Sequence, residues 1–390
     1  ATTEIYTLSL HDALPISNGE NQRERMRERP RKGGKPMSKS FVNKALLGGA
    51  VAAGAAVWAI APRTFSDKRR NYVPSIPDVW YAHRGLHDAG SGLTAQYANE
   101  SGEYVALARR MAMKAGYGSP SVTGAIAPEN SLAAFAAACE AGYGIELDLQ
   151  MTADGEIVVV HDGDLMRVAG DPRRIADLTY DELTRIPLFP TDAPGAAVAA
   201  PLPGSLEKPP LVTTPDSAPE GYFQHVPLFA DVLKVVAGRV PLIVEYKFDD
   251  NSKWGSRDVE LMEKGDALLQ AYSGAYVIES FNPAAVNWYK ENRPEVCRGQ
   301  LSWWPQGEEK PSDPASLAKE YAAGALIFDW ISRPDFVAYD WHGGNSPQVR
   351  LARFMGAVPV SWTVRSRDEL AQCDDWFDHH IFEAFVPDEQ

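Results

Sequence analysis

The stretch Gly144-Ile145-Glu146-Leu147-Asp148-Leu149 alternates acidic and aliphatic side chains. Residues two apart on a β-strand point to the same face, so Glu146 and Asp148 project together and the aliphatic side chains face the other way. A carboxylate pair is costly to bury, and packing alone is therefore a poor reason for its place on an apolar strand. The stretch predicts a buried strand with functional groups on one face.

Three further polar clusters each follow an apolar run. They are His83-Arg84-Gly85, His161-Asp162, and Glu245 with Lys247. Taken singly, a histidine at a strand end is more often structural than catalytic. Four clusters in order, each after its own apolar run, are hard to explain in that way. Together they supply the histidines, carboxylates and cations needed for metal-assisted cleavage of a phosphate ester.

Strand and helix patterns alternate along residues 71–390. Helical patterns occupy 131–141, 229–237, 259–272 and 283–292, and the eight predicted strands are 79–82, 144–149, 157–161, 242–247, 275–281, 296–302, 325–329 and 358–364. Alternating strands and helices form a parallel sheet, and a barrel of eight such units needs about 250 residues. We therefore predict an α/β fold, a (β/α)8 TIM barrel. Its polar clusters would lie at the C-terminal ends of the strands, where barrel active sites are found.

Two insertions interrupt the predicted barrel, at about residues 86–127 and 187–222. The first leaves from the active-site end of the first strand and carries a predicted helix from about 102 to 114. Its Tyr97, Tyr104 and Tyr117 suit a lid that covers part of the substrate pocket, and a helix that braces the barrel rim is the alternative. The second insertion is rich in Pro and Ala and is expected to be an irregular loop.

Eight short motifs stand in order along the chain. They are Tyr81-Ala82-His83-Arg84-Gly85, Ala127-Pro128-Glu129-Asn130-Ser131-Leu132-Ala133-Ala134-Phe135, Gly144-Ile145-Glu146-Leu147-Asp148, Thr152-Ala153-Asp154-Gly155, Val159-Val160-His161-Asp162, Val244-Glu245-Tyr246-Lys247, Glu279-Ser280-Phe281-Asn282-Pro283 and Val360-Ser361-Trp362-Thr363-Val364. As an ordered set they resemble the glycerophosphodiester phosphodiesterase family over about residues 78–386. The set is specific, whereas a single His-Arg-Gly would be a weak signal.

The catalytic and metal-binding residues are expected in four of these motifs, those that contain His83, Glu146 with Asp148, His161, and Glu245. By resemblance to the family, His83 and His161 form the general acid/base pair, and the sequence does not show which one is the acid. Glu146, Asp148 and Glu245 offer the hard oxygen ligands that suit Ca²⁺ or Mg²⁺. One divalent cation is therefore the expected cofactor.

The expected substrate-binding residues are Arg84, Lys247, Phe281 and Trp362. Arg84 can hold a phosphate oxygen through its guanidinium group, and Lys247 adds a second positive charge beside the metal. Phe281 and Trp362, at the ends of two predicted strands, would line the alcohol pocket, and a place in the apolar core is the alternative for both.

Several neighbouring side chains have structural alternatives. Arg84 is also placed to form an ion pair with Glu129. Asn130 and Ser131 are expected to cap the following helix rather than to touch the substrate. Asp162 would either orient the adjacent histidine or form a turn.

Charge is distributed unevenly along the chain. Residues 1–70 hold 13 Lys/Arg and 6 Asp/Glu, a net charge of +7, while the remainder holds 25 and 46, a net charge of −21. An acidic catalytic part argues against a nucleic-acid partner, since binding of nucleic-acid phosphates needs a basic surface. The three cysteines have neither metal-ligand spacing nor the even number of a disulfide framework.

The N-terminal region suggests an extension followed by a membrane anchor. Residues 1–36 are polar and arginine-rich, read as a disordered or artefactual extension that resembles translated sequencing-adapter sequence, and Met37 is the expected natural start. Residues 37–70 contain an uncharged Ala/Gly-rich run at about 45–61, close to the minimum of about 17 residues for a membrane span. We expect a single-pass, uncleaved anchor, against the alternatives of a cleaved signal peptide and a soluble helix.

Basic residues flank the uncharged run on both sides. Counted from Met37, four follow it and two precede it, which favours a cytoplasmic catalytic domain.

The sequence thus predicts a membrane-anchored, metal-dependent hydrolase that cleaves glycerophosphodiesters to an alcohol and glycerol 3-phosphate. A related barrel phospholipase acting on phospholipids or lysophospholipids is the alternative within the same chemistry. A catalytically silent binding protein on the same scaffold is the alternative from another class, and the presence of both histidines and all three carboxylates argues against it.

Overall fold

The computed structural model describes residues 53–66, 74–189, 223–249, 253–305 and 313–388, all within one compact unit, Val51–Gln390. The predicted extension, the first part of the predicted membrane run and most of the second insertion lie outside these residues.

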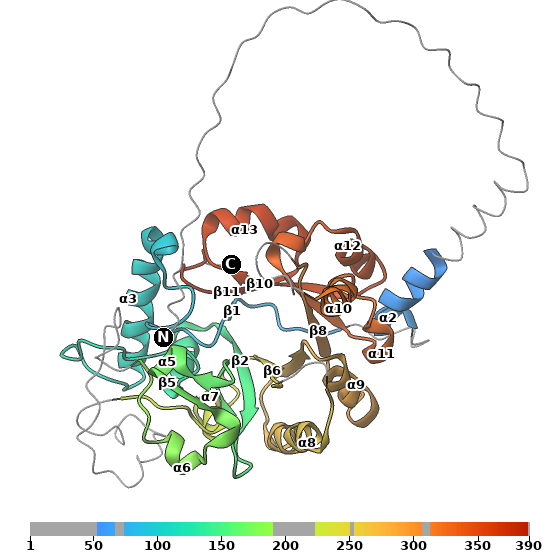
Figure 1. The fold of residues 1–390 in the computed structure, drawn as a ribbon. Helices are drawn as coiled ribbons and strands as arrows, with labels where there is room; N and C mark the ends of the chain where they lie inside the picture. Colours follow the sequence, from blue (N-terminus) through green and yellow to red (C-terminus); the bar gives the residue numbers. More distant parts are fainter. Residues whose placement is uncertain (1–52, 67–73, 190–222, 250–252, 306–312, 389–390) are drawn as a thin grey trace, which may run out of the picture. The chain divides into compact units, whose positions relative to one another are not determined.

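A closed barrel of parallel strands forms the centre of this unit, which confirms the predicted fold (Figure 1). β1 pairs with both β2 and β11 and so closes the ring. Around the ring the order is β1-β11-β10-β9-β8-β7-β6-β2. The strands are β1 (Tyr81–Ala82), β2 (Gly144–Met151), β6 (Leu242–Tyr246), β7 (Tyr276–Ser280), β8 (Arg298–Ser302), β9 (Phe336–Asp340), β10 (Val358–Val364) and β11 (His379–Phe382).

Six of the eight predicted strands belong to the barrel and two do not. The predicted strand 157–161 contains β3 (Ile157–Val159), which pairs antiparallel with the end of β2 outside the parallel ring. The predicted strand 325–329 is wrong, because these residues lie between α10 (Pro314–Gly324) and α11 (Asp329–Ser332). The sixth and eighth barrel strands, β9 and β11, were not predicted. β11 begins with His379 and His380, and two polar rings obscure the apolar run of a buried strand.

Helices surround the ring of strands, with α8, α9, α12 and α13 on its outside in Figure 1. Those that follow barrel strands include α4 (Leu132–Ala141), α7 (Phe229–Val236), α8 (Ser256–Ala271), α9 (Pro283–Asn292), α12 (Pro347–Phe354) and α13 (Arg367–Cys373). A small excursion after β3 holds β4 (Asp164–Leu165), α5 (Met166–Ala169), β5 (Asp171–Arg174) and α6 (Tyr180–Leu183). Short 3-10 turns cover Ala95–Tyr97, Ile175–Asp177, Trp341–Gly343 and Asp374–Trp376.

The strands divide their side chains between two apolar layers. Leu147 and Val244 pack outward into the large cluster that the helices cover. Ile243 belongs to a separate cluster made mostly by other strand side chains. Because side chains alternate along a strand, Glu245 shares the face of Ile243, and the acidic residues of β2 and β6 point into the barrel.

The first insertion forms a long helix, α3 (Ala98–Lys114), that packs against α4. Its Tyr104, Ala108 and Ala112 are completely buried, and Tyr117 is nearly so. Tyr97, by contrast, lies at the active-site end, where it lines a cavity of about 370 Å³ together with Trp362. Most of the insertion therefore braces the barrel, and its start alone is placed to reach a substrate.

Residues 53–60 are helical, and α2 (Arg63–Ser66) follows after the non-helical Ala61 and Pro62. The last residues of the predicted membrane run, Ala59–Ala61, are buried against the barrel. The Arg333 guanidinium donates to the carbonyl oxygens of Trp58 and Ala61 at 2.7 and 2.8 Å. Within the part of the chain that the structure describes, no helix is long and apolar enough to cross a membrane.

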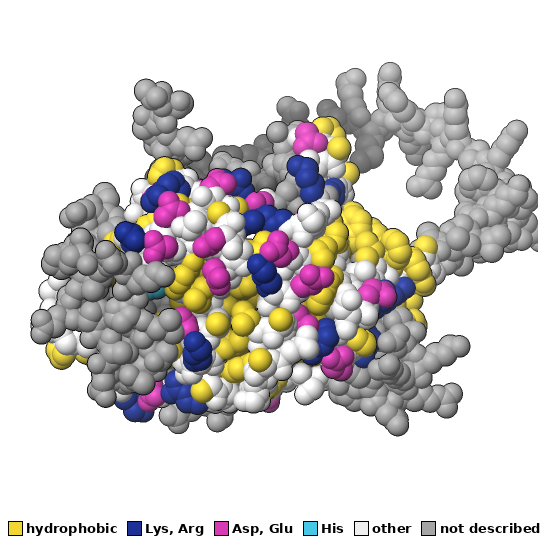
Figure 2. Space-filling model, turned by 90° about the horizontal axis from the view of Figure 1, so that it is seen from below, with side chains coloured by type: hydrophobic (Ala, Val, Ile, Leu, Met, Phe, Trp, Pro, Cys, Tyr) yellow, Lys and Arg dark blue, Asp and Glu magenta, His cyan; other side chains and the backbone are white. Residues whose placement is uncertain are grey.

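An exposed apolar surface surrounds this N-terminal segment. Figure 2 shows hydrophobic side chains gathered on the right-hand part of the lower face, the side on which Figure 1 places α2 and α11. Trp58 stacks on Trp330 with ring centroids 5.5 Å apart, and both rings remain about half exposed. The large exposed apolar side chains here, which we call the aromatic surface, are Trp58, Phe65, Ile327, Trp330 and Phe354.

The burial of α3 predicts a large effect of Tyr104 on stability. Tyr104→Ala should lower the free energy of unfolding by about 3–5 kcal/mol, the usual cost of removing a buried aromatic side chain. Glu103→Ala, at the exposed neighbouring position, is the control and should change it by about 0.5 kcal/mol or less. Urea unfolding measures both. Equal, small effects would mean that α3 is a detachable lid.

Candidate active site

Three buried carboxylates converge at the C-terminal end of the barrel. Glu146, Asp148 and Glu245 each offer an oxygen, and these oxygens lie within 4.8 Å of one another. The register of the sheet explains the convergence, because Asp148 on β2 stands directly beside Glu245 on β6. Glu146 lies two residues before Asp148 and therefore on the same face.

The cluster fits a divalent cation. Burial and the neighbouring carboxylates Asp148 and Glu245 raise the pKa of Glu146 well above its usual range. Burial and the charge of Asp148 raise the pKa of Glu245 to about 7, although Lys247 opposes the shift. Oε1 of Glu245 has no hydrogen-bond partner among the described residues. A cation held by these oxygens would supply the positive charge that the cluster lacks.

Lys247 follows β6 and neutralises part of the cluster. Its Nζ lies 2.7 Å from Oε2 of Glu245 and 3.2 Å from Oδ1 of Asp148. Burial alone would raise the pKa of Asp148, but Lys247, His161 and Arg84 together hold it well below its usual range. Asp148 is therefore the permanently charged member of the cluster.

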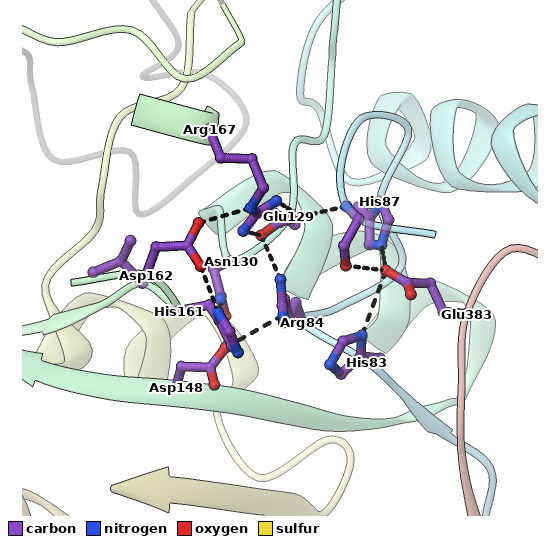
Figure 3. A network of polar contacts seen from close by, with 12 residues as sticks. His83, Arg84, His87, Glu129, Asn130, Asp148, His161, Asp162, Arg167 and Glu383 are labelled. Atoms are coloured by element: carbon purple, nitrogen blue, oxygen red, sulfur yellow. Dashed lines mark hydrogen bonds and ion pairs between the residues drawn. The ribbon is translucent and has the colours of Figure 1, made fainter. Parts of the chain in front are cut away.

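One histidine reaches the site on β3. The strand returns past the end of β2, where the Val160 amide donates to the Asp148 carbonyl at 3.0 Å, and His161 follows. Nδ1 of His161 lies 2.7 Å from Oδ1 of Asp162, which favours the orienting role over the turn, the two alternatives for this carboxylate. Arg167 donates to Asp162 at 2.7 Å and so connects the pair to the rest of the network (Figure 3).

The second histidine is held by a residue that the sequence did not reveal. Nδ1 of His83 lies 3.4 Å from Oε1 of Glu383, which directly follows β11. The same oxygen lies 3.0 Å from Nε2 of His87, and Arg365 donates to the other carboxylate oxygen at 2.8 Å. Glu383 is completely buried. It was missed because β11 itself was not predicted.

Arg84 lies between the two histidines in Figure 3. Its guanidinium donates to Glu129 at 2.8 Å, which confirms the expected ion pair, and its Nε lies 3.6 Å from Asp148. Arg167 also donates to both oxygens of Glu129, at 2.6 and 2.8 Å. Burial would raise the pKa of Glu129, but the two arginines lower it well below its usual range.

The backbone adopts an uncommon conformation at Arg84 and at Asn130, both of which lie in the candidate site. Arg84 and Asn130 both adopt positive φ angles, 56° and 55°, which are uncommon for residues other than glycine and often occur at functional sites. The Asn130 amide donates to the Arg84 carbonyl at 2.9 Å, so the two bends support each other. Gly85 follows at φ 81°, where a Cβ would lie 2.9 Å from the backbone of Ala134.

Both histidines favour the neutral form. Burial and the nearby Arg84 lower the pKa of His83 to about 4, although Glu383 opposes the shift. Burial, Lys247 and Arg84 also lower the pKa of His161. Each ring can therefore accept a proton near neutral pH, and a bound phosphate would favour protonation of either one.

Phe281 and Trp362 lie next to each other at the mouth of the barrel. Their rings form an edge-on contact with centroids 5.5 Å apart. Nζ of Lys247 lies 5.7 Å from the centroid of the Phe281 ring. The structure therefore brings the predicted alcohol-binding residues beside the predicted metal site.

Of the two residues expected to cap the helix α4, only one does so. Ser131 caps α4, since its side chain accepts from the Ala134 amide, but the expected capping role of Asn130 is wrong. Its side chain donates instead to Asp148 at 2.8 Å.

Glu279 on β7 pairs in register with Glu245 and is almost fully buried. It stood in a quoted motif, but without the register its proximity to the metal cluster was not visible.

Carboxylates that can hold a metal, two neutral histidines and two cations at the open end of a barrel define a site suited to phosphate esters. The sequence model of the Glycerophosphoryl diester phosphodiesterase family matches residues 122–382, and the chain belongs to this family. His83 and Arg84 lie before the matched range.

Individual relatives agree with this assignment. The chain is 43% identical over 60 residues to a glycerophosphodiester phosphodiesterase of Caldanaerobacter subterraneus, a match covering 15% of this chain and 25% of that protein. It is 25% identical over 235 residues to a glycerophosphodiester phosphodiesterase of Bacillus subtilis, covering 60% and 70% respectively. In the short matches of higher identity, the chain spans about a quarter of the relatives' length.

A solved structure supports the fold. The structure of an Oleispira antarctica phosphodiesterase in complex with the product sn-glycerol-3-phosphate superposes with a TM-score of 0.50 at 16% identity. The match covers 80% of this chain and 94% of that one.

The raised pKa of Glu245 predicts how metal and pH act on stability. The pKa of Glu245 is about 7 in the folded protein, above the ordinary 4.5. Its favourable contribution to the free energy of unfolding is therefore complete below about pH 4.5 and is lost as pH rises through about 7. Over this pH range, the free energy of unfolding of the metal-free protein should therefore fall by up to about 3 kcal/mol more than that of the Glu245→Gln variant. Calorimetry in EDTA measures the loss.

Added Ca²⁺ or Mg²⁺ should restore that stability, with an effect that grows with pH because the cation replaces the proton. Glu260→Gln changes a carboxylate on the outer helix α8 and should respond to metal as the unchanged protein does. A melting temperature insensitive to either cation at about pH 8, where the raised pKa leaves Glu245 ionised, would contradict the metal site.

Glu383 should act as a positioning residue for His83. Glu383→Gln keeps the shape but removes the charge that His83 and His87 share, so kcat should fall about 10- to 100-fold with little change in KM. Glu369→Gln is the matched control, since Glu369 contacts Tyr97 and the Arg365 amide but neither histidine. A fall in thermal stability with unchanged kcat would reduce Glu383 to a structural role.

Proposed function

We propose that the protein hydrolyses glycerophosphodiesters to an alcohol and glycerol 3-phosphate, using one divalent cation, Ca²⁺ or Mg²⁺. The observation that supports this best is the placement of His83 and His161 on either side of Arg84 (Figure 3). Asp148, a member of the three-carboxylate cluster, lies in the same network. Membership of the family supports the glycerol part of the proposal.

The chain's own residues account for binding of the phosphate. Arg84 is held by Glu129 and Asp148, so its guanidinium is already oriented when a phosphate oxygen arrives. Lys247 provides a second positive charge on the other side of Asp148. A divalent cation bound by Glu146, Asp148 and Glu245 would supply Lewis acidity and neutralise charge that develops on the phosphoryl oxygens.

The two histidines account for the proton transfers. One ring takes the proton from the attacking water, and the other gives a proton to the departing alkoxide. Asp162 lies 2.7 Å from Nδ1 of His161 and Glu383 lies 3.4 Å from Nδ1 of His83. Nε2 of His83 faces the carboxylate cluster, 3.9 Å from Oε2 of Glu146. Phe281 and Trp362 would then contact the organic part of the substrate.

Replacement of either histidine tests this assignment. His83→Ala and His161→Ala should each lower turnover of glycerophosphocholine, glycerophosphoethanolamine and glycerophosphoglycerol by about 10²-fold or more. His379→Ala, at the start of β11 and therefore at the opposite end of the barrel, is the control. EDTA should abolish turnover. Full activity of either variant, or in excess EDTA, would refute the mechanism.

Phosphodiester cleavage of phospholipids or lysophospholipids is the second candidate, and one observation favours it. Phe281 also lines a cavity of about 570 Å³ whose other lining residues include Trp303 and Ile331, and apolar side chains of this kind suit a hydrocarbon chain.

We also propose that the chain is attached to a membrane through the uncharged run that ends at the barrel, with the catalytic domain on the cytoplasmic side. The exposed Trp58 and Trp330 rings support attachment, because tryptophan side chains suit the boundary between lipid and water. The excess of basic residues after the run supports the orientation. Protease accessibility of the barrel in right-side-out and inverted vesicles tests the orientation.

Flotation with anionic vesicles tests the attachment. Replacing Trp58 and Trp330 together by Ser should reduce the vesicle-bound fraction several-fold while preserving the barrel, since both rings are about half exposed. Phe223→Ser together with Met166→Ser, away from the aromatic surface, provides the control. An unchanged bound fraction in the Trp58/Trp330 variant would exclude the aromatic surface from lipid contact.

A further inference from the structure

Two buried carboxylates lie behind the residues that we propose to act on the phosphate. Glu129 accepts from Arg84 at 2.8 Å, and Glu383 lies 3.4 Å from Nδ1 of His83. Glu129 precedes α4 and Glu383 follows β11, so the two acids belong to different parts of the barrel. Whatever joins the acids therefore sets how Arg84 and His83 lie relative to each other.

A serine of the first insertion joins the two acids. The Ser91 hydroxyl donates to Oε1 of Glu383 at 2.7 Å, and the Ser91 amide donates to Oε2 of Glu129 at 2.5 Å. Arg365 donates to the other oxygen of Glu383 at 2.8 Å, so the serine completes the contacts of a charged group. Hydrogen bonds to charged groups are stronger than those between neutral groups.

This link completes a chain of polar contacts that begins at one candidate catalytic histidine and ends at the other. In order, its members are His161, Asp162, Arg167, Glu129, Ser91, Glu383 and His83. Figure 3 shows the part around Glu129 and the part around Glu383. Without the Ser91 hydroxyl, the chain would separate into one part behind His161 and another behind His83.

The backbone on both sides of Ser91 approaches the acids so closely that a side chain would not fit. A Cβ at Gly90 would lie 2.7 Å from Oε2 of Glu129. Gly92 adopts a φ angle of 67°, and a Cβ there would overlap the carboxylate of Glu383. Glycine permits such an approach and such a φ angle. The segment therefore packs its backbone directly against both acids.

The rest of the insertion holds this segment in place. Asp88, three residues before Ser91, accepts from the amides of Ile126 and Ala127 at 2.8 Å each. It thereby ties the start of the insertion to its end. Arg109 on α3 donates to Asp88 at 2.6 Å, and α3 itself packs against α4. The buried helix therefore anchors the loop that contacts the two acids.

We propose that Ser91 is a positioning residue for catalysis, because it joins the two acids that hold Arg84 and His83. Arg167 is its counterpart on the side of His161. The proposal rests on the proposed function of the active site. Loss of either residue leaves the groups that bind the substrate in the site but disturbs their alignment, which lowers kcat more than it raises KM.

Removal of the hydroxyl provides the first test. In the full-length protein with Ca²⁺ or Mg²⁺, Ser91→Ala should lower kcat for glycerophosphocholine by about 5- to 20-fold and change KM by about twofold or less, since one hydrogen bond to a charged group is lost. Ser121→Ala is the matched control, because this exposed serine of the same insertion contacts Ser119. Unchanged kcat in Ser91→Ala would overturn the inference while leaving the proposed function intact.

Two glycines of the insertion provide the second test. Gly90→Ala adds a methyl group against Glu129 and should lower kcat about 10-fold or more, although Ser91 itself is unchanged. Gly102 lies on α3, and a Cβ there would meet open space. Gly102→Ala should therefore leave kcat unchanged and raise the melting temperature, because alanine favours helix. Equal kcat values for the two variants would contradict the positioning role.

The counterpart residue has its own test. Arg167→Lys keeps the positive charge but cannot contact Glu129 and Asp162 together, so kcat should fall about 10- to 100-fold. Arg173→Lys, which changes an exposed arginine of β5 paired with Asp171, is the control and should keep the kcat of the unchanged protein. Full activity of Arg167→Lys would mean that charge alone matters and would overturn the continuous chain.

A double-mutant cycle tests whether the chain is continuous through Ser91. Arg167→Lys and Glu383→Gln alter its two halves, so their combined effect on kcat should be about threefold or more below the product of the single effects. In the Ser91→Ala background the effects should multiply, because the chain is already broken there. The same coupling in both backgrounds would exclude Ser91 as the link.

Histidine NMR separates the inference from the proposed function. Nε2 of His87 lies 3.0 Å from the Glu383 oxygen that accepts from Ser91, and His87 is completely buried. Its ring N–H proton should exchange with water about tenfold faster in Ser91→Ala than in the unchanged protein. This result without turnover of any substrate would refute the proposed function and support the network. Equal exchange rates would refute the network.

Discussion

The pairing of β2 with β6 in one register is the constraint on which the site depends. It sets Asp148 beside Glu245, inside a barrel whose outward faces are apolar. Glu146 and Glu279 add two more buried carboxyl groups, so the inside of the barrel concentrates negative charge away from water. Such a cluster is stable only with compensating cations. Lys247 and Arg84 supply part of the compensation, and a divalent cation would supply the rest.

The same electrostatic constraint shapes the surroundings of the two histidines. Arg84 and burial keep His83 neutral, and Lys247 acts on His161 in the same sense. Each ring is then held by its own carboxylate, Asp162 or Glu383. Both carboxylates are themselves paired with arginines, Arg167 and Arg365. Orientation thus comes from charge pairs behind the rings, where they do not compete with a substrate for Nε2.

The segment 323–331 links the active site to the N-terminal part of the chain. One side lines the cavity beside Phe281 and the other contacts the helix that begins the described structure. Arg333, just after it, holds that helix through two carbonyl oxygens. The end of the predicted membrane run is therefore part of the barrel's packing. The membrane attachment that we propose would involve the aromatic surface as well as the run itself.

The sequence by itself indicated the barrel class and the carboxylate cluster, because alternation along Gly144–Leu149 and along Leu242–Lys247 reports directly which side chains share a face. It could not show β9 or β11, since His379 and His380 obscure the pattern of a buried strand. Glu383 was lost with β11. Its approach to His83 and His87, over nearly 300 positions of chain, exists only because the last strand closes the ring against the first. Contacts of that kind depend on register and closure, which no local pattern contains.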